Sequence, residues 1–295
     1  MRSFLYIILA CVISGFITAK YIVPQGGGVT VEKPQETTFE RIQRTRTLRC
    51  GYYIVASLFR KNEKTGQFSG PAFDIVNTMA NNLKLKVEWV AEVALPNLSE
   101  DLKNGRFDML CVPIATNAAR GQVMSVSKKV FFTPLYLYIR ANDTRDEESL
   151  AWVNDPNIKL SAIDGLIFSS LYAYYFPKAQ VLSLPELSPF TDQILQVSTG
   201  KADATLMLKY DASLFAEHNP NQIKLGYKKP VLITSNSYWL PHGDTKVKGM
   251  IDTVIDEMLY NGTIDNILAK HEGETRGAYR WRVAPEYEVP KMHGD

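Results

Sequence analysis

Residues 240–271, LPHGDTKVKGMIDTVIDEMLYNGTIDNILAKH, carry the most specific pattern in the chain. Between Val247 and Leu259 the apolar residues recur three and four positions apart, which predicts an amphipathic helix with one buried face. Asn261 and Gly262 end that helix, and Thr263 is expected to cap a second, shorter one. An apolar run and a Pro-His-Gly-Asp turn come first, so the predicted order is strand, turn, long helix, short helix.

Upstream of this stretch, predicted strands and helices alternate from residue 46 onward. The expected strands are residues 50–54, 87–93, 108–114, 135–139, 158–163 and 202–208. The expected helices are one that Asp74 caps and those at 98–103, 165–175, 188–198 and 211–217, the last capped by Asp211. The run at 108–114 is almost continuously apolar, as a buried parallel strand requires. This alternation predicts an α/β fold with doubly wound sheets.

Composition excludes several classes of function. The chain has 295 residues, 45% of them apolar and 22% charged, with a formal net charge of +2. These values are typical of a globular protein with a packed core. Basic residues form no block, so no nucleic-acid partner is expected. The four histidines are scattered without the spacing of metal ligands, and neither a metal nor a cofactor is expected.

The N-terminal segment has the features of an export signal. Arg2 precedes an uncharged apolar run from Phe4 to Ala19, which Lys20 ends. Residues 1–23 are therefore predicted to be a signal peptide or an uncleaved membrane anchor, and the pattern leaves both open. The stretch at 24–40 contains three consecutive glycines and is predicted to be a flexible linker. The polar stretch at 273–295 is expected to be a C-terminal tail.

Export also affects whether the cysteines can form a disulfide. Cys50 and Cys111 lie in two apolar, strand-like runs. An oxidising compartment permits a disulfide between them. Neighbouring central strands more usually carry buried free thiols, so free thiols are the favoured expectation here.

Four sequence blocks together resemble a known family. They are TLRCGY at 47–52 with GPAFDI at 70–75, LKNGRFDMLCVPI at 102–114, STGKAD at 198–203, and the 240–271 stretch. The chain resembles the periplasmic solute-binding proteins of the amino-acid uptake type, which are bacterial extracellular solute-binding protein family 3 with the type II periplasmic-binding fold. The resemblance implies two doubly wound lobes joined by two hinge strands. Lobe 1 would comprise residues 41–131 and 236–272, and lobe 2 residues 135–231.

The resemblance also implies a ligand site between the lobes. Arg120, twelve residues after Asp108, matches the family arginine that forks onto a ligand carboxylate. The rest of the implied ligand-binding set is Tyr52 and Tyr53 after the first strand, Pro113, Ala115, Thr116 and Asn117 before the arginine, and Gly165, Leu166 and Leu208 in lobe 2. The family commonly places an acidic residue for the ligand amine where this chain has Leu208. Either another carboxylate replaces that residue, with Glu92 and Asp164 as candidates, or the ligand has no free α-amine.

The implied function is capture of a small carboxylate-bearing ligand of apolar or modest side-chain character in the periplasm, without chemistry. An inner-membrane ABC permease would be the partner, and the protein would be a monomer. Two alternatives stay open. One is a membrane-tethered sensor, which an uncleaved anchor and the glycine-rich linker would suit. The other is a dehydratase on the same fold, for which the sequence offers no convincing general acid.

Overall fold

The computed structural model describes residues 36–145, 147–186, 188–271 and 273, so the predicted export segment at 1–23 and all of the C-terminal tail except Gly273 lie outside the described residues. A nine-stranded mixed sheet runs through the described chain in the order β4-β1-β5-β11-β6-β9-β7-β8, with β10 paired to β6. Its strands are β1 (Thr47–Tyr52), β4 (Lys86–Glu92), β5 (Met109–Ala115), β6 (Ser125–Arg140), β7 (Lys159–Ile163), β8 (Gln180–Leu184), β9 (Ala204–Leu208), β10 (Ile223–Leu225) and β11 (Leu232–Leu240).

Lobe 1 is built on the parallel strands β4, β1 and β5. Alternate residues of β5 pack on opposite faces of the sheet, as a strand's period of two requires. Met109 and Cys111 belong to the larger core, which residues of the helices at 71–82 and 245–260 cover. Leu110 packs on the other side with the short helix at 98–103. The other elements of this lobe are α2 (Thr38–Thr45), the hairpin β2 (Arg60–Lys61) and β3 (Phe68–Ser69), α3 (Pro71–Asn82), the 3₁₀ turn Leu95–Asn97, α4 (Leu98–Lys103), α5 (Ala118–Gly121), α9 (Thr245–Tyr260) and α10 (Thr263–Lys270).

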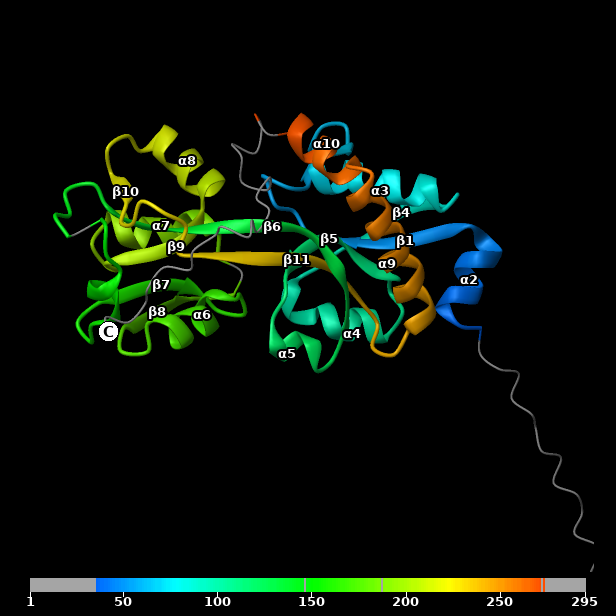
Figure 1. Ribbon diagram of the computed structural model, residues 1–295, viewed down its shortest axis with the longest axis horizontal. Helices are drawn as coiled ribbons and strands as arrows, with labels where there is room; N and C mark the ends of the chain where they lie inside the picture. Colours follow the sequence, from blue (N-terminus) through cyan, green and yellow to red (C-terminus); the bar gives the residue numbers. More distant parts are fainter. Residues whose placement is uncertain (1–35, 146, 187, 272, 274–295) are drawn as a thin grey trace, which may run out of the picture. The chain divides into compact units, whose positions relative to one another are not determined.

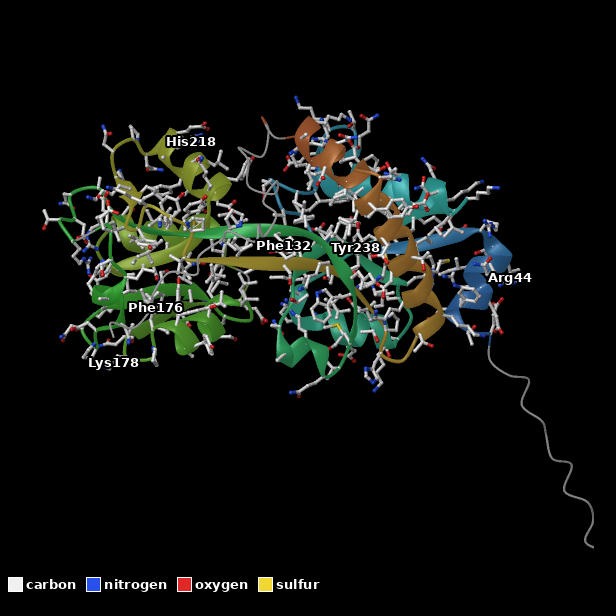
Figure 2. All side chains as sticks on the ribbon, viewed as in Figure 1. Arg44, Phe132, Phe176, Lys178, His218 and Tyr238 are labelled. Atoms are coloured by element: carbon white, nitrogen blue, oxygen red, sulfur yellow. A yellow bond between two sulfur atoms is a disulfide. The ribbon has the colours of Figure 1, made fainter. Side chains whose placement is uncertain are left out.

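Lobe 2 repeats the strand order of lobe 1. In each lobe the first strand lies between the second and the third, as β4-β1-β5 in one and β8-β7-β9 in the other. Its core includes Leu160 and Ala162 of β7 and the fully buried Tyr172. The helices of this lobe are the 3₁₀ turn Ala151–Asn154, α6 (Phe168–Tyr175), α7 (Phe190–Ser198) and α8 (Lys209–His218). Figure 2 shows Phe176 among the side chains of this lobe and Tyr238 among those of lobe 1.

Two antiparallel strands connect the lobes. Strand β11 pairs with β6 from Leu240↔Ser125 to Leu232↔Leu135, and both strands continue from one lobe into the other (Figure 1). Strand β6 then pairs with β9 in lobe 2, while β11 pairs with β5 in lobe 1. The fold is therefore the α/β architecture of two linked lobes that the sequence predicts. The resemblance implies hinges near residues 131–135 and 231–236, and residues 131–135 of β6 pair with residues 232–236 of β11.

Two predicted helix caps of lobe 1 are wrong. Helix α10 begins at Thr263 itself, with Gly262 at its N-cap position and no side-chain cap among the described residues. Helix α3 begins at Pro71 with Gly70 at its N-cap position, and Asp74 lies inside the first turn. Proline is well suited to the first helical position, because its missing N–H would have no partner there. The Asp74 carboxylate instead accepts hydrogen bonds from Lys270 and His271 of the C-terminal part of lobe 1, each at 2.9 Å. Helix α2 begins at Thr38, so residues 38–40 are helical although the linker was predicted to reach residue 40.

The expectation of free thiols is also wrong. Cys50 and Cys111 form a disulfide, with a Cα–Cα distance of 5.3 Å. They lie on the neighbouring strands β1 and β5, and both side chains belong to the same core cluster. The register of the two strands therefore brings the sulfur atoms together on one face of the sheet.

Asp108 connects three elements of lobe 1. Its side chain is completely buried and accepts hydrogen bonds from the Arg49 backbone N–H at 2.8 Å and from Arg49 Nη2 at 2.9 Å. It also pairs with Arg41 of α2. A buried carboxylate needs such partners, because an unpaired charge in the interior is costly. Asp108 thus holds α2 and β1 to the start of β5.

None of the helices in the described part of the chain is both long and apolar enough to cross a membrane.

Candidate functional site

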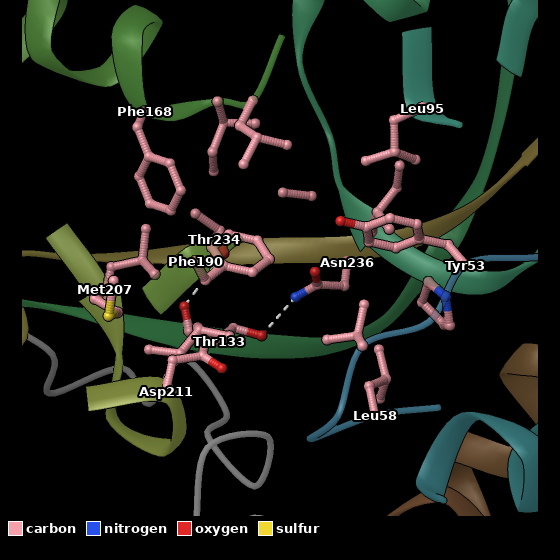
Figure 3. Close-up of a pocket in the computed structure, with 18 of the residues that line it drawn as sticks. Tyr53, Leu58, Leu95, Thr133, Phe168, Phe190, Met207, Asp211, Thr234 and Asn236 are labelled. Carbon is pink, nitrogen blue, oxygen red and sulfur yellow. Dashed lines mark hydrogen bonds between the residues drawn. The ribbon is translucent and has the colours of Figure 1, made fainter. Parts of the chain in front are cut away.

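A cavity lies beside the strands that connect the lobes, and both lobes contribute to its wall. Its volume is about 120 Å³. Figure 3 shows most of its lining side chains around β6 and β11. The lining residues are Tyr53, Val55, Leu58, Leu95, Pro113, Ile114, Ala115 and Arg120 from lobe 1, Thr133, Leu135, Thr234 and Asn236 from the connecting strands, and Leu166, Ile167, Phe168, Phe190, Met207, Leu208 and Asp211 from lobe 2.

The wall is mainly apolar, with few polar groups. On the connecting strands, Asn236 Nδ2 donates to Thr133 Oγ1 at 2.7 Å, and Thr234 Oγ1 donates to the Thr133 carbonyl at 3.3 Å (Figure 3). In these two bonds, polar groups of the connecting strands β6 and β11 satisfy one another. The charged groups of the wall are Arg120 and Asp211, one from each lobe.

Arg120 lies in the short helix α5, which follows the end of β5. Asn117 caps that helix, since its Oδ1 accepts from the Arg120 backbone N–H at 2.8 Å. The Arg120 guanidinium donates from Nη2 to the Gly165 carbonyl oxygen of lobe 2 at 3.2 Å. Burial lowers the pKa of Arg120, while the nearby Glu186 carboxylate opposes that change. Arg120 therefore connects the two lobes at the cavity. The bond to Gly165 uses one of the five N–H donors of its guanidinium group.

Gly165 and the start of α6 form the lobe-2 side of this contact. Gly165 has φ of +74°, and a Cβ atom at this position would lie 2.2 Å from Glu186 Oε1, so both conformation and space favour glycine. Leu166, Ile167 and Phe168 follow and line the cavity. The N-terminus of α6 is therefore at the cavity wall. Nearby, Ser169 Oγ is buried and has no hydrogen-bond partner among the described residues.

Asp211 does not cap helix α8, so that prediction is wrong. Leu208 occupies the N-cap position, no side chain in the described part of the chain caps this helix, and Asp211 lies within the first turn. Its partly buried side chain lines the cavity (Figure 3). Burial raises the pKa of Asp211 to about 7. Asp211 follows the end of β9 by three residues. An acidic residue at this position can cap the next helix or line a cavity, and the sequence does not distinguish the two roles.

Tyr53 interacts electrostatically with both charged groups of the wall. Burial raises the pKa of Tyr53, the Asp211 carboxylate raises it further, and Arg120 opposes the rise. Its ring lies among the side chains lining the cavity (Figure 3).

The structure brings together six of the residues singled out in the sequence and leaves others outside the cavity. Those in the wall are Arg120, Tyr53, Pro113, Ala115, Leu166 and Leu208. Tyr52 points away, into an aromatic cluster with Phe59, Phe68 and Trp89 in the lobe-1 core. Successive residues of a strand face opposite sides, which explains why only one of the two tyrosines reaches the cavity.

The remaining predicted residues lie outside the cavity wall. Thr116 Oγ1 lies 3.0 Å from Ser235 Oγ of β11, and Asn117 caps α5 as described. Gly165 and Glu92 line an adjoining chamber with Glu186. Asp164 lines neither this chamber nor the cavity. Asp211 is thus the acid in the cavity wall, in place of the two candidates considered from the sequence.

Within residues 36–145, 147–186, 188–271 and 273, no group of three or more His, Cys, Asp or Glu side chains could hold a metal ion.

Comparison with known proteins identifies the family and the fold. Residues 48–274 match the model of the bacterial extracellular solute-binding proteins, family 3. No curated protein matches the chain. The fold is similar to that of the ancestral amino acid-binding protein AncCDT-1, a precursor of cyclohexadienyl dehydratase, with 20% identity, a TM-score of 0.65 and coverage of 79% of this chain and 98% of that one.

Two further solved structures show the same fold. The periplasmic VFT2 domain of BvgS from Bordetella pertussis has 15% identity and a TM-score of 0.64 over 79% of this chain and 96% of that one. The amino acid ABC transporter substrate-binding protein AbpA from Streptococcus pneumoniae, bound to L-arginine, has 17% identity and a TM-score of 0.62 over 80% and 98%. At such identities the likeness concerns the fold.

Proposed function

Because this chain belongs to the bacterial extracellular solute-binding proteins of family 3, we propose that it captures a small carboxylate-bearing molecule in the cavity between its lobes. The observation that carries the proposal is Arg120, which lies at the cavity wall beside the N-terminus of α6. A guanidinium and a helix N-terminus both favour a carboxylate, the first through paired charge-assisted hydrogen bonds and the second through free backbone N–H groups.

The rest of the wall supports an apolar ligand body. Phe168, Phe190 and Met207 from lobe 2 face Leu58 and Leu95 from lobe 1 around the cavity (Figure 3). An amino acid with an apolar side chain fits this combination of one anion-binding end and apolar walls. Solved relatives of the fold include proteins described as amino-acid-binding.

Capture takes place outside the inner membrane under this proposal, and the ligand is delivered to an ABC permease. The Cys50–Cys111 disulfide supports an oxidising compartment such as the periplasm. Residues on both lobes and on both connecting strands line the cavity, so a ligand there contacts all of them at once. Such contacts stabilise the closed arrangement of two lobes, which is the form that a permease would recognise.

The ligand class is tested by thermal shift with the twenty standard L-amino acids, their 2-oxo acids and small monocarboxylates. A ligand that binds only the folded protein raises the midpoint as its concentration exceeds Kd. We expect the largest rise with an amino acid of apolar side chain. A shift with none of the compounds would contradict the proposal.

Arg120→Ala is expected to weaken binding of the best ligand from this screen by at least about tenfold, since a charge-assisted contact to the carboxylate is lost. Calorimetry on the variant measures the change, and circular dichroism checks that the fold is kept. Arg106→Ala is the matched control, because Arg106 pairs with Asp101 on the surface of lobe 1 and does not line the cavity. Equal losses in both variants, or unchanged affinity in Arg120→Ala, would contradict the assignment.

A second candidate function is a dehydratase, and the observation that favours it is Asp211. A dehydratase needs a general acid, and a carboxyl group with a pKa of about 7 inside a cavity is suited to that role. The test is incubation of the pure protein with prephenate and arogenate. Turnover that Asp211→Asn abolishes would replace the binding-only function with catalysis, whereas binding without turnover would leave capture as the function.

A further inference from the structure

Glu186 lies at the point where the two lobes meet beside the cavity. It follows the end of β8 by two residues. The Asp164 backbone N–H donates to the Leu184 carbonyl oxygen at 3.0 Å, which holds the end of β8 next to the chain that leads into Gly165. A Cβ atom on Gly165 would lie 2.9 Å from both Cγ and Cδ of Glu186, so this side chain covers the glycine.

Arg120 reaches the same glycine from lobe 1. Its Nη2 atom donates to the Gly165 carbonyl oxygen at 3.2 Å. The Glu186 carboxylate stabilises the positive charge of Arg120 through space, which opposes the lowering of the Arg120 pKa by burial. From lobe 2, a carbonyl oxygen and a carboxylate thus both stabilise the guanidinium that a ligand carboxylate would bind.

Acidic groups outnumber basic ones around the cavity and the adjoining chamber. The two spaces share three lining residues, Tyr53 among them, so a ligand in the cavity lies next to the chamber. Of the described residues that line either space, Arg120 is the only lysine or arginine, whereas Asp211, Glu92 and Glu186 carry carboxyl groups. A ligand carboxylate therefore depends on one cation, and Glu186 already interacts with that cation.

This charge balance distinguishes ligands with one carboxylate from ligands with two. Gly165 uses one of the five N–H donors of Arg120, which leaves donors for a single ligand carboxylate. A second carboxylate would lie between apolar walls and near Glu186, with no further cation among the described lining residues. A charge without a partner in such surroundings, close to a like charge, is unfavourable.

We propose that Glu186 is a specificity-determining residue, whose carboxylate competes with the ligand for Arg120 and makes the site reject ligands with a second carboxylate. The inference rests on the proposed function, because it takes Arg120 to bind the ligand carboxylate. It deepens that function by limiting the ligands to monocarboxylates. Selection by a repulsive group in the site is a general way to exclude a related compound.

The expected effect is moderate, because Glu186 is exposed. Water and dissolved ions weaken the interaction of an exposed charge with its neighbours. Removal of the Glu186 charge should therefore change dissociation constants several-fold and leave binding itself intact. The change should be larger for a dicarboxylate than for a monocarboxylate, since only the dicarboxylate places a second negative charge in the site.

The first experiment compares L-glutamate with L-glutamine, which has nearly the same size and lacks the second carboxylate. L-Leucine is added as a monocarboxylate with an apolar side chain. The dependence of Tm on the concentration of each compound gives its Kd, even for weak ligands. In the wild-type protein, L-leucine should bind most tightly and L-glutamate least. In Glu186→Gln, the ratio of the L-glutamate Kd to the L-glutamine Kd should fall by at least about threefold.

Glu92→Gln is the matched control. Glu92 lines the same chamber from lobe 1 and is also exposed, whereas the carboxylate that acts on Arg120 is that of Glu186. This variant should keep the ratio of the two Kd values within about twofold of that of the wild type. Circular dichroism checks that both variants keep the fold.

The second experiment tests whether the selection is electrostatic. The same Kd values are measured as the ionic strength rises from about 0.05 M to about 0.5 M, which shortens the range of the Glu186 charge. The salt weakens the contact of Arg120 with every ligand carboxylate, and the ratio of the two Kd values removes this common effect. The ratio should fall with salt in the wild-type protein and fall less in Glu186→Gln.

The outcomes separate the inference from the proposed function. If L-leucine and L-glutamine bind and Glu186→Gln leaves the ratio unchanged, the role of Glu186 is overturned and solute capture stands. Equal weakening of all three compounds in Glu186→Gln would also overturn it, because Glu186 would then only position Arg120. Equal falls of the ratio in both variants would assign the selection to the chamber as a whole. If none of the three compounds binds the wild type, the inference is overturned, and the wider ligand screen decides the proposed function.

Discussion

Replacing Cys50 and Cys111 together with alanine is expected to lower the free energy of unfolding by about 4 kcal/mol. The disulfide joins residues separated by 61 positions, and a cross-link that closes a loop of this length restricts the unfolded chain. Alanine is preferred to serine because both side chains are completely buried in an apolar core. Urea unfolding monitored by circular dichroism measures the change.

The loss must be separated from the effect of the smaller side chains. The matched control is the wild-type protein unfolded in the presence of dithiothreitol, which breaks the bond and keeps both sulfur atoms. We expect the reduced wild type to lose most of the same stability as the double variant. A reduced protein as stable as the oxidised one would contradict the prediction and assign the loss to packing.

Asp108→Asn is expected to lower the free energy of unfolding by about 3 kcal/mol, measured by urea unfolding with the disulfide intact. The carboxylate is fully buried and accepts from Arg49 at three donors, while Arg41 of α2 pairs with it as well. Asparagine keeps the size and removes the charge, so both arginines lose their counter-charge. Their side chains are 20% and 31% exposed, which lets water compensate part of the loss.

Asp101→Asn provides the control for this prediction. Asp101 pairs with Arg106 at 3.1 Å, and the Arg106 side chain is 53% exposed. Exposed ion pairs contribute little, so this substitution should change the stability by less than about 1 kcal/mol. If both substitutions lowered the free energy of unfolding by similar amounts, the burial of Asp108 would not determine how much it contributes to stability.

The disulfide and Asp108 also bear on the cavity, since both connect β1 with β5. Tyr53 follows β1, and Pro113 to Ala115 end β5, so the two strands carry much of the lobe-1 wall. The tight connection lies before the residues that line the cavity, at the buried part of each strand. The lobe-1 residues that line the cavity therefore follow directly after the cross-linked part of these two strands.

Much of the fold could be predicted because its signals are local. Helix α9 occupies Thr245–Tyr260, as the apolar spacing from Val247 to Leu259 predicts. The buried strand expected at 108–114 is β5, displaced by one residue. Each of these elements depends on residues within a few turns or a single strand, and periodicity records which face is buried. Family membership followed from the same local blocks in their order.

The site was predicted less completely, because its residues meet only through tertiary contacts. Arg120 could be placed by its spacing, but its bond to Gly165 crosses 45 positions. Tyr52 and Tyr53 are adjacent in sequence, and only the orientation of β1 decides which faces the cavity. The sequence favours a helix cap for Asp211, because a short acidic side chain after a strand is typical both of a cap and of a residue that lines a cavity.

The sequence by itself determined the succession of strands and helices, because periodic burial and turn residues act over short distances. The two-lobed arrangement and the family followed from the resemblance of four sequence blocks to known solute-binding proteins. Only the tertiary structure decided that Cys50 and Cys111 are bonded and that Asp211 lines the cavity. The physical reason is that a disulfide depends on strand register across 61 positions, and a carboxyl pKa depends on burial by residues from distant elements. Neither quantity is recorded in the local pattern of residues.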